Sequence, residues 1–227
     1  MSLLVYHRGG TVPLMLTLSA APSTEPISTA EAKSHLRVDV SDDDTLIGTI
    51  VASARRACEE HTNRALITQT WTMFMDFFPF TGAGAPLWEG TREAPETILG
   101  GQARYIEVPK PPLVSITSIK TYDDDDAAST FASSNYFVDT ATEPGRVALR
   151  SGQSWPIPTR TINGVEVIFV AGYGDAGSNV PDDLLRGMYL LIGHMYENRE
   201  HVVVGSSVSE LPFSVQSFWD PKRIIDL

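Results

Sequence analysis

The chain has 227 residues, of which 42% are hydrophobic and 20% are charged, and its formal net charge is −11. This composition is that of an ordinary folded protein with a sizeable core, and no run approaches the roughly 20 apolar residues of a membrane span. The negative charge disfavours a general nucleic-acid binder, although an acidic wall can surround a DNA duplex and let it slide without holding its phosphates.

The first 26 residues are predicted to form an extended arm that pairs with a neighbouring subunit. Arg8 and the apolar run from Val12 to Ala21 superficially resemble a secretion signal. A proline and two threonines interrupt that run. We therefore favour the arm over a signal.

Two helices are predicted next. Ser28 and Glu31 form a capping box that starts a short helix. Ser41, followed by three aspartates, is expected to cap a longer helix that ends near Asn63. Apolar residues at helical spacing predict one buried stripe on this helix, which includes the single cysteine, Cys58. The charged residues predicted on its other side are Arg55, Arg56, Glu59 and Glu60.

From Ile67 to about Ala171 the pattern predicts strands, because apolar and polar residues alternate as they do in half-buried strands. The first predicted strand carries the alternation from Thr68 to Met75. Five more are predicted over Tyr105–Val108, Val114–Tyr122, Asn135–Val138, Arg146–Leu149 and Val165–Val170. Between Thr81 and Gly101 the chain is rich in Gly, Pro and Ala, which predicts a long exposed loop.

Pro181 in a first helical turn predicts a last helix, and after His201 a linker leads into an apolar tail. Pro212 and Pro221 argue against one continuous helix in this tail. Such a segment either orders on a partner, with aromatic anchors, or folds back over its own core, and the sequence leaves both open. The candidate partner-binding residues are Leu211, Phe213, Phe218, Trp219, Ile224 and Ile225.

This order of elements predicts an α+β fold, because helices and strands are segregated along the chain. The predicted divisions are an arm (1–26), a first helical part (27–66), a β-rich domain (67–178) with the loop 81–101, a second helical part (179–201) and a tail (202–227).

No catalytic constellation is found in the sequence, so neither an enzyme nor a bound cofactor or metal is expected. There is no Gly-x-Ser-x-Gly elbow, and the five histidines show no zinc-ligand spacing. The Asp123–Asp126 run lacks the glycine and the distal glutamate of an EF-hand, and is predicted to be a solvated turn.

Several segments together resemble the head–tail connector (adaptor) proteins of long-tailed phages, prophages and gene transfer agents. They cover most of residues 27–223 in the family's order. They are "ISTAEAKSHLRVDVSDDDTLIGTIVASARRACEEHTNRALITQTW", "IEVPKPPLVSITSIKTYD", "PGRVAL", "VEVIFVAGYGD", "VPDDLLRGMYLLIGHMYENRE" and "LPFSVQSFWDPKR". The arm, the Thr81–Gly101 loop and the Asp123–Asp126 turn depart from the family pattern.

The resemblance implies a small helical bundle carrying an inserted antiparallel β domain. About a dozen copies would form a ring in the virion neck, made in the host cytoplasm, which binds the portal and a downstream stopper or tail protein. The ring would continue the channel for passing double-stranded DNA, and the C-terminal segment would grip the portal. No membrane partner is expected.

Two rival functions remain open on the sequence. Another virion component, such as a stopper, a tail terminator or a tail-tube protein, would be dominated by strands. A carbohydrate-binding module would use Trp71, Trp88 and Trp155 as a sugar platform, although tryptophans more often lie in cores or interfaces.

Overall fold

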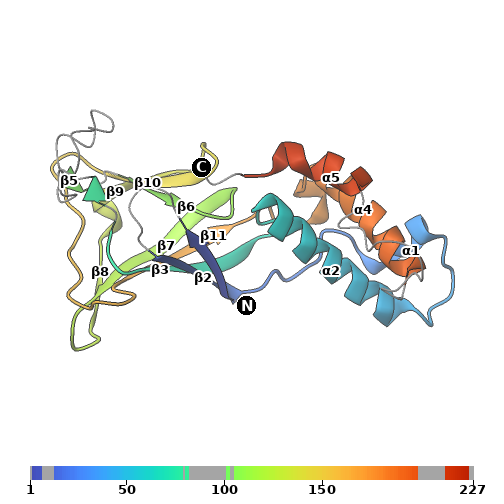
Figure 1. Ribbon diagram of the computed structural model, residues 1–227, viewed down its shortest axis with the longest axis horizontal. Helices are drawn as coiled ribbons and strands as arrows, with labels where there is room; N and C mark the ends of the chain where they lie inside the picture. Colours follow the sequence, from blue (N-terminus) through green and yellow to red (C-terminus); the bar gives the residue numbers. More distant parts are fainter. Residues whose placement is uncertain are drawn as a thin grey trace, which may run out of the picture. The chain divides into compact units, whose positions relative to one another are not determined.

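The computed structural model describes residues 2–6, 13–78, 80–81, 101–102, 105–198 and 213–224. It confirms the α+β fold, with helices in one unit and antiparallel sheets in another (Figure 1). The β unit comprises residues 1–21, 70–171 and 226–227, and the helical unit comprises residues 22–69 and 172–225. In sequence, the strands from 70 to 171 are therefore inserted between two halves of the helical unit.

The first helix, α1 (Thr29–Leu36), begins with the predicted capping box. The Glu31 amide donates to the Ser28 hydroxyl at 3.2 Å, and the Ser28 amide donates to the Glu31 carboxylate at 2.8 Å. Hydrogen bonds from the Ser28 side chain and backbone hold the pKa of Glu31 below its ordinary value. The helix ends at Arg37 in a left-handed conformation, with φ of 57°.

Loss of this cap is expected to cost stability in a pH-dependent way. Ser28→Ala should lower the free energy of unfolding by about 1 kcal/mol. Because the pKa of Glu31 is lowered in the folded chain, its carboxylate stabilises the fold above the ordinary pKa of 4.5 and loses that contribution as the pH falls through the lowered value. Urea unfolding at about pH 7 and about pH 3 should show a shallower acid loss in the variant. Equal acid losses in the two proteins would contradict this prediction.

The second helix, α2 (Asp44–Thr62), carries the predicted buried stripe. Its buried apolar residues are Ile47, Ile50, Val51, Ala54 and Cys58. Burial raises the pKa of the Cys58 thiol, which disfavours the reactive thiolate. The helix ends at Asn63, with φ of 56°, close to the predicted position. The predicted Ser41 cap is wrong: the helix begins after Asp43, and the Ser41 carbonyl instead accepts the Asp44 amide at 3.1 Å in a preceding turn.

Two of the four charged residues on the other side of α2 are also buried. Arg55 and Glu59 are 9% and 8% exposed, whereas Arg56 and Glu60 are exposed. Arg55 donates to Glu59 at 2.8 Å and to Glu25 at 2.7 Å. Burial opposes the charge of Arg55, but the Glu25 hydrogen bond and the negative charge of Glu59 outweigh it, so the pKa of Arg55 is raised. The buried cation is thus compensated by two carboxylates.

The Glu59 carboxylate also fixes the chain that follows α2. One of its oxygens accepts the backbone amide of Leu66 at 3.0 Å and the side-chain amide of Gln69 at 2.7 Å. Gln69 is the first residue of the next strand, β3. Glu59 therefore holds the helix-to-strand junction by accepting hydrogen bonds from three groups, which include the Arg55 guanidinium.

The β unit contains a six-stranded sheet in the order β1-β2-β3-β11-β7-β8, a three-stranded sheet in the order β6-β10-β9, and the short pair β4-β5. The β1–β2, β2–β3, β7–β11, β7–β8, β6–β10, β9–β10 and β4–β5 pairings are antiparallel. The strands are β1 (Ser2–Tyr6), β2 (Pro13–Ala20), β3 (Gln69–Met75), β4 (Phe80–Thr81), β5 (Gly101–Gln102), β6 (Tyr105–Val108), β7 (Leu113–Tyr122), β8 (Ala128–Thr130), β9 (Tyr136–Asp139), β10 (Gly145–Leu149) and β11 (Val165–Ala171).

All six predicted strands are present within a few residues of their expected bounds. The prediction missed β8, whose three residues are all exposed at a sheet edge and so show no apolar alternation. Most of the predicted loop, residues 82–100, lies outside the described residues; β4 and β5 pair at its two ends.

Residues 2–6 form β1, which pairs with β2 of the same chain, so the prediction of an extended arm that pairs with a neighbouring subunit is wrong there. It is also wrong for residues 13–20. They form β2, which pairs with β3 of the same chain from Leu14↔Met75 to Ala20↔Thr70. Leu14 and Leu16 are 4% and 0% exposed, so this strand lies in the β unit's own sheet. Leu14 and Leu16 occupy alternate positions, which is the apolar spacing of a strand and is visible in the sequence.

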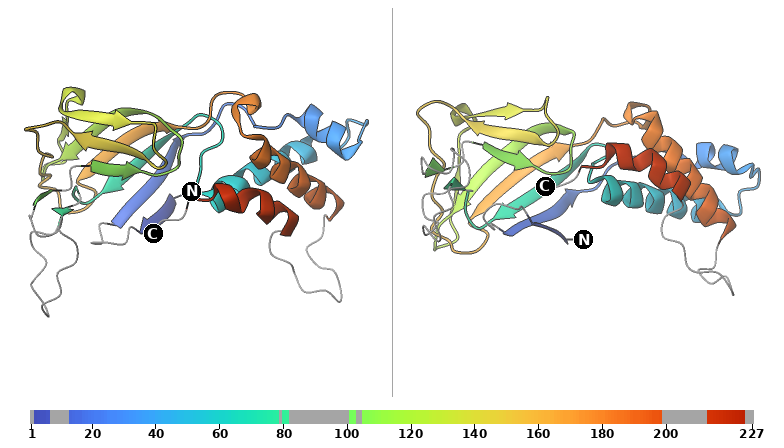
Figure 2. Two further views of the ribbon diagram at one scale, coloured as in Figure 1. Left: turned by 90° about the horizontal axis from the view of Figure 1, so that it is seen from above. Right: turned by 45° about the horizontal axis from the view of Figure 1, so that its top comes forward.

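The last long helix, α4 (Asp182–Glu197), starts after Pro181 as predicted. It lies beside α2 in the helical unit, with the short helix α5 (Phe213–Trp219) against it (Figures 1 and 2). The large apolar residues buried between these helices include Ile47, Leu66, Leu184, Met188, Ile192, Val215 and Trp219. Among the described ranges, no helix is both long and apolar enough to cross a membrane.

Candidate functional site: the docked C-terminal segment

The C-terminal segment, residues 213–224, is helical from Phe213 to Lys222. α5 (Phe213–Trp219) is followed directly by the 3₁₀ helix η3 (Asp220–Lys222), and Pro221 lies in the first turn of η3. Proline is compatible with a first turn because its missing N–H has no helical partner there. The segment therefore forms two short helices, in agreement with the expectation that it is not one continuous helix.

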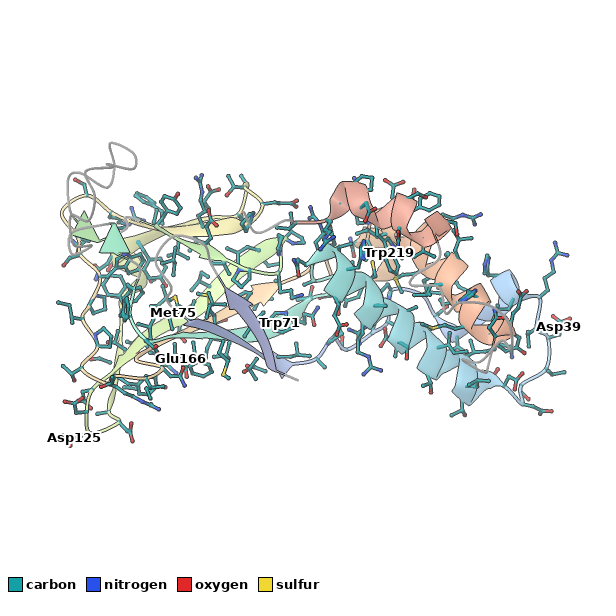
Figure 3. The ribbon with its side chains drawn as sticks, in the orientation of Figure 1. Asp39, Trp71, Met75, Asp125, Glu166 and Trp219 are labelled. Carbon is teal, nitrogen blue, oxygen red and sulfur yellow. The ribbon has the colours of Figure 1, made fainter. Side chains whose placement is uncertain are left out.

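Trp219 is the centre of the segment's contact with the helical unit. Its side chain is 0% exposed, and its indole N–H donates to the Leu184 carbonyl at 3.2 Å (Figure 3). Gly187 makes room for the ring, because a Cβ at that position would come within 2.1 Å of the indole nitrogen. Val215, one turn earlier on α5, is also fully buried. Both side chains belong to the core of the helical unit.

Polar contacts attach the same segment to the end of α2. The His61 ring nitrogen and an Asp220 carboxylate oxygen are 2.7 Å apart. Arg64, which is 6% exposed, donates from its Nε to the Lys222 carbonyl at 2.6 Å. Each contact joins positions more than 150 residues apart in sequence, so the attachment exists only in the folded chain.

The final described residue is held by the backbone of the same helix end. The Ile224 amide donates to the Thr62 carbonyl at 3.0 Å, and its carbonyl accepts the Asn63 side-chain amide at 3.1 Å. Thr62 ends α2, and helix ends leave carbonyls without helical partners. The C-terminal segment thus satisfies groups that the end of α2 exposes.

The six candidate partner-binding residues do not share one environment. Trp219 lies in the core of the helical unit, as expected if the segment folds back over its own core. It is therefore not an exposed anchor for a partner. Phe218 and Ile224 are half-buried. Phe213 begins α5, with its side chain outside the described set, and Leu211 and Ile225 lie outside the described residues.

The tryptophans do not form a sugar platform in the described part of the β unit. Trp71 and Trp155 are 9% and 2% exposed, and Trp155 stacks on Phe78 with ring centroids 4.5 Å apart. The third member of the suggested platform, Trp88, lies outside the described residues. Trp71 and Trp155 are therefore core residues.

The Asp123–Asp126 run forms an exposed turn. The Asp123 carboxylate accepts the backbone amides of Asp125 at 3.0 Å and Ala127 at 2.8 Å. Asp126 has φ of 62° and pairs with Arg160 at 3.4 Å. These are the side-chain-to-backbone contacts of an aspartate turn. Across the described residues, no group of three or more His, Cys, Asp and Glu side chains is arranged to hold a metal ion.

Solved structures of related shape were found for nearly the whole chain. A chain from the neck of an empty gene transfer agent (GTA) particle, computed with C6 symmetry, has a TM-score of 0.69 and 22% identity, with 94% of this chain and 97% of that chain covered. A chain from the virion of a native gene transfer agent particle has a TM-score of 0.69 and 21% identity, over 93% and 96% of the two chains.

A third solved chain belongs to the neck of a native GTA particle computed with C12 symmetry. Its TM-score is 0.58 at 20% identity, with 92% of this chain and 97% of that chain covered. No protein-family model and no curated protein sequence matches the chain. At these identities the likeness establishes a shared fold, and the fold implied by the motif resemblance to connector proteins is confirmed.

Proposed function

We propose that the chain is a head–tail connector (adaptor) subunit, a structural protein of the neck in a phage or gene transfer agent particle. The observation that carries this proposal is the full-length fold likeness to chains of GTA necks, at a TM-score of 0.69. Both units take part in that likeness, because 94% of the chain is covered.

The subunit would act as one member of a closed ring between the portal and a stopper or tail protein. The C12 symmetry of one similar neck supports a ring of twelve copies, which would be a head-to-tail assembly closed by rotation. The charge of −11 per chain suits a channel for double-stranded DNA, because an acidic wall repels phosphates and lets the duplex pass.

The C-terminal segment would present the portal-binding surface. Trp219 and Val215 fix the segment to the helical unit, so it is ordered before it meets a partner. A preordered segment loses less conformational entropy on binding. The half-buried Phe218 and Ile224 would then contact the portal, together with Leu211, Phe213 and Ile225. Repetition around a ring would make weak single contacts strong by avidity.

Binding to heads tests the proposal directly. The purified chain should bind DNA-filled, tailless heads of its cognate particle and add a ring at the portal vertex, measured by electron microscopy. Density for residues 213–224 against the portal is expected, and the same segment facing away from it would contradict the portal-binding surface. A folded chain that does not bind these heads, but binds completed necks or tails, would favour a stopper, a tail terminator or a tail-tube protein instead.

A further inference from the structure

The three-stranded sheet β6-β10-β9 presents an exposed aromatic face that the proposed portal contact leaves unused. Tyr105 and Phe137 are 47% and 52% exposed, and both lie opposite Ala148 of the central strand, so they flank a small residue. The Arg150 guanidinium lies 3.8 Å from the centroid of the Phe137 ring. Arg146 lies 5.7 Å from the centroid of the Tyr105 ring. We call these five residues the Arg150 face.

This combination of residue types is characteristic of protein interfaces. Tyrosine, phenylalanine and arginine are enriched where proteins meet, and alanine truncation at such positions commonly costs binding energy. The aromatic rings already hold the guanidinium groups in place, so little side-chain entropy remains to be lost on contact. The Arg150 face is therefore a preformed docking surface.

Arg150 gives this surface an uncompensated positive charge. Arg146 donates to Asp139 at 2.7 Å, and this hydrogen bond holds the pKa of Asp139 below its ordinary value. Lys120 and Arg160 also pair with carboxylates, Glu166 and Asp126 respectively. Among the described residues of the β unit, Arg150 differs from these cations: its side chain is exposed, and no carboxylate lies within ion-pair distance of it.

We propose that the Arg150 face docks a second copy of this chain, and that its partner surface is the Asp124–Asp125 turn of that copy. The proposal rests on the proposed ring, since it names the contact that joins neighbouring subunits. The proposal is argued from charge complementarity. Copies of a chain with a net charge of −11 repel one another, and a cation that faces carboxylates offsets this repulsion at the contact.

The Asp124–Asp125 turn meets the requirements for the complementary surface. Both aspartates are exposed, and neither is among the described ion pairs, since Arg160 contacts Asp126. Within the β unit, β10 lies along the upper edge in Figure 1 and Asp125 lies at the lower edge in Figure 3. A head-to-tail contact uses two different surfaces of each subunit, and these two are well separated.

A charge-swap experiment tests the contact. One variant carries Arg150→Glu and a second carries Asp124→Lys with Asp125→Lys. Assembly is measured by sedimentation velocity and by electron microscopy of heads, in whichever condition the wild type forms rings. Each variant alone is expected to associate at least about tenfold more weakly, because like charges then face each other. Mixed together they should assemble again, since every contact in an alternating ring is complementary.

Matched controls separate this contact from net charge. Arg56→Glu makes the same charge change at an exposed position of α2, and Asp39→Lys with Asp42→Lys does so on exposed residues of the helical unit. Both controls should assemble as the wild type does. Rings formed equally well by the Arg150→Glu variant, or no recovery in the mixture, would overturn the inference and leave the neck role intact. A wild type that forms rings neither free nor on heads overturns both.

Discussion

Replacing Trp219 with alanine is expected to lower the free energy of unfolding by about 3–5 kcal/mol, the range for removing a large buried aromatic side chain. The indole is fully buried in the helical core, and its N–H bond to the Leu184 carbonyl would be lost as well. Gly187 leaves a hollow shaped for this ring, which alanine would leave empty. Chemical denaturation followed by circular dichroism measures the loss.

Two further variants, one at another position of α5 and one at Trp219 itself, serve as comparisons for Trp219→Ala. Ser217→Ala, at an exposed position of the helix, should change stability by less than about 0.5 kcal/mol. Trp219→Phe keeps most of the volume but loses the hydrogen bond, so an intermediate loss is expected. A loss below about 1 kcal/mol for Trp219→Ala would mean that the segment is free of the core and that its aromatic ring is available to a partner.

The stability of the Trp219→Ala variant also determines what its binding to heads can show. A variant that no longer binds heads because its helical unit is loosened says nothing of a direct portal contact. Phe218, half-buried on the same helix, is the better position for testing that contact, because its truncation removes less of the core.

The second large effect is expected at Glu59. Glu59→Ala should lower the free energy of unfolding by about 3–5 kcal/mol, because it leaves the buried Arg55 with one carboxylate and removes the acceptor of the Leu66 amide. The Gln69 side chain loses its partner too. Thermal and urea unfolding would both report this loss.

Substitutions at and beside this position provide the comparison. Glu60→Ala, next in sequence but exposed, should change stability by less than about 0.5 kcal/mol. Glu59→Gln keeps an acceptor oxygen but no charge, so its loss should fall between the two. Similar losses for Glu59→Ala and Glu60→Ala would show that the buried network contributes little.

Local physics explains which elements the sequence determined. The Ser28–Glu31 capping box and the Asn63 helix end depend on hydrogen bonds and backbone preferences within a few residues. The six predicted strands and the α2 stripe follow from apolar periodicity, which the sequence displays directly. Cys58 was correctly placed in the core because it falls on that stripe. The α+β class followed from the order of these elements.

The features that only the tertiary structure decided depend on contacts between distant segments. Periodicity predicted one side of α2 as buried, but Arg55 and Glu59 are buried on another side because Glu25, Leu66 and Gln69 surround them. Residues 13–20 form a strand because β3 offers them an edge with which to pair.

The C-terminal segment shows most clearly the difference between what the sequence determined and what the tertiary structure decided. Its sequence showed that apolar residues are concentrated there, but an apolar residue gains the same free energy in its own core as on a partner. Trp219 lies in the core because Gly187 leaves room for its ring and the Leu184 carbonyl accepts its N–H. Composition determined that the segment must be buried, and only the shape of the folded helical unit decided where.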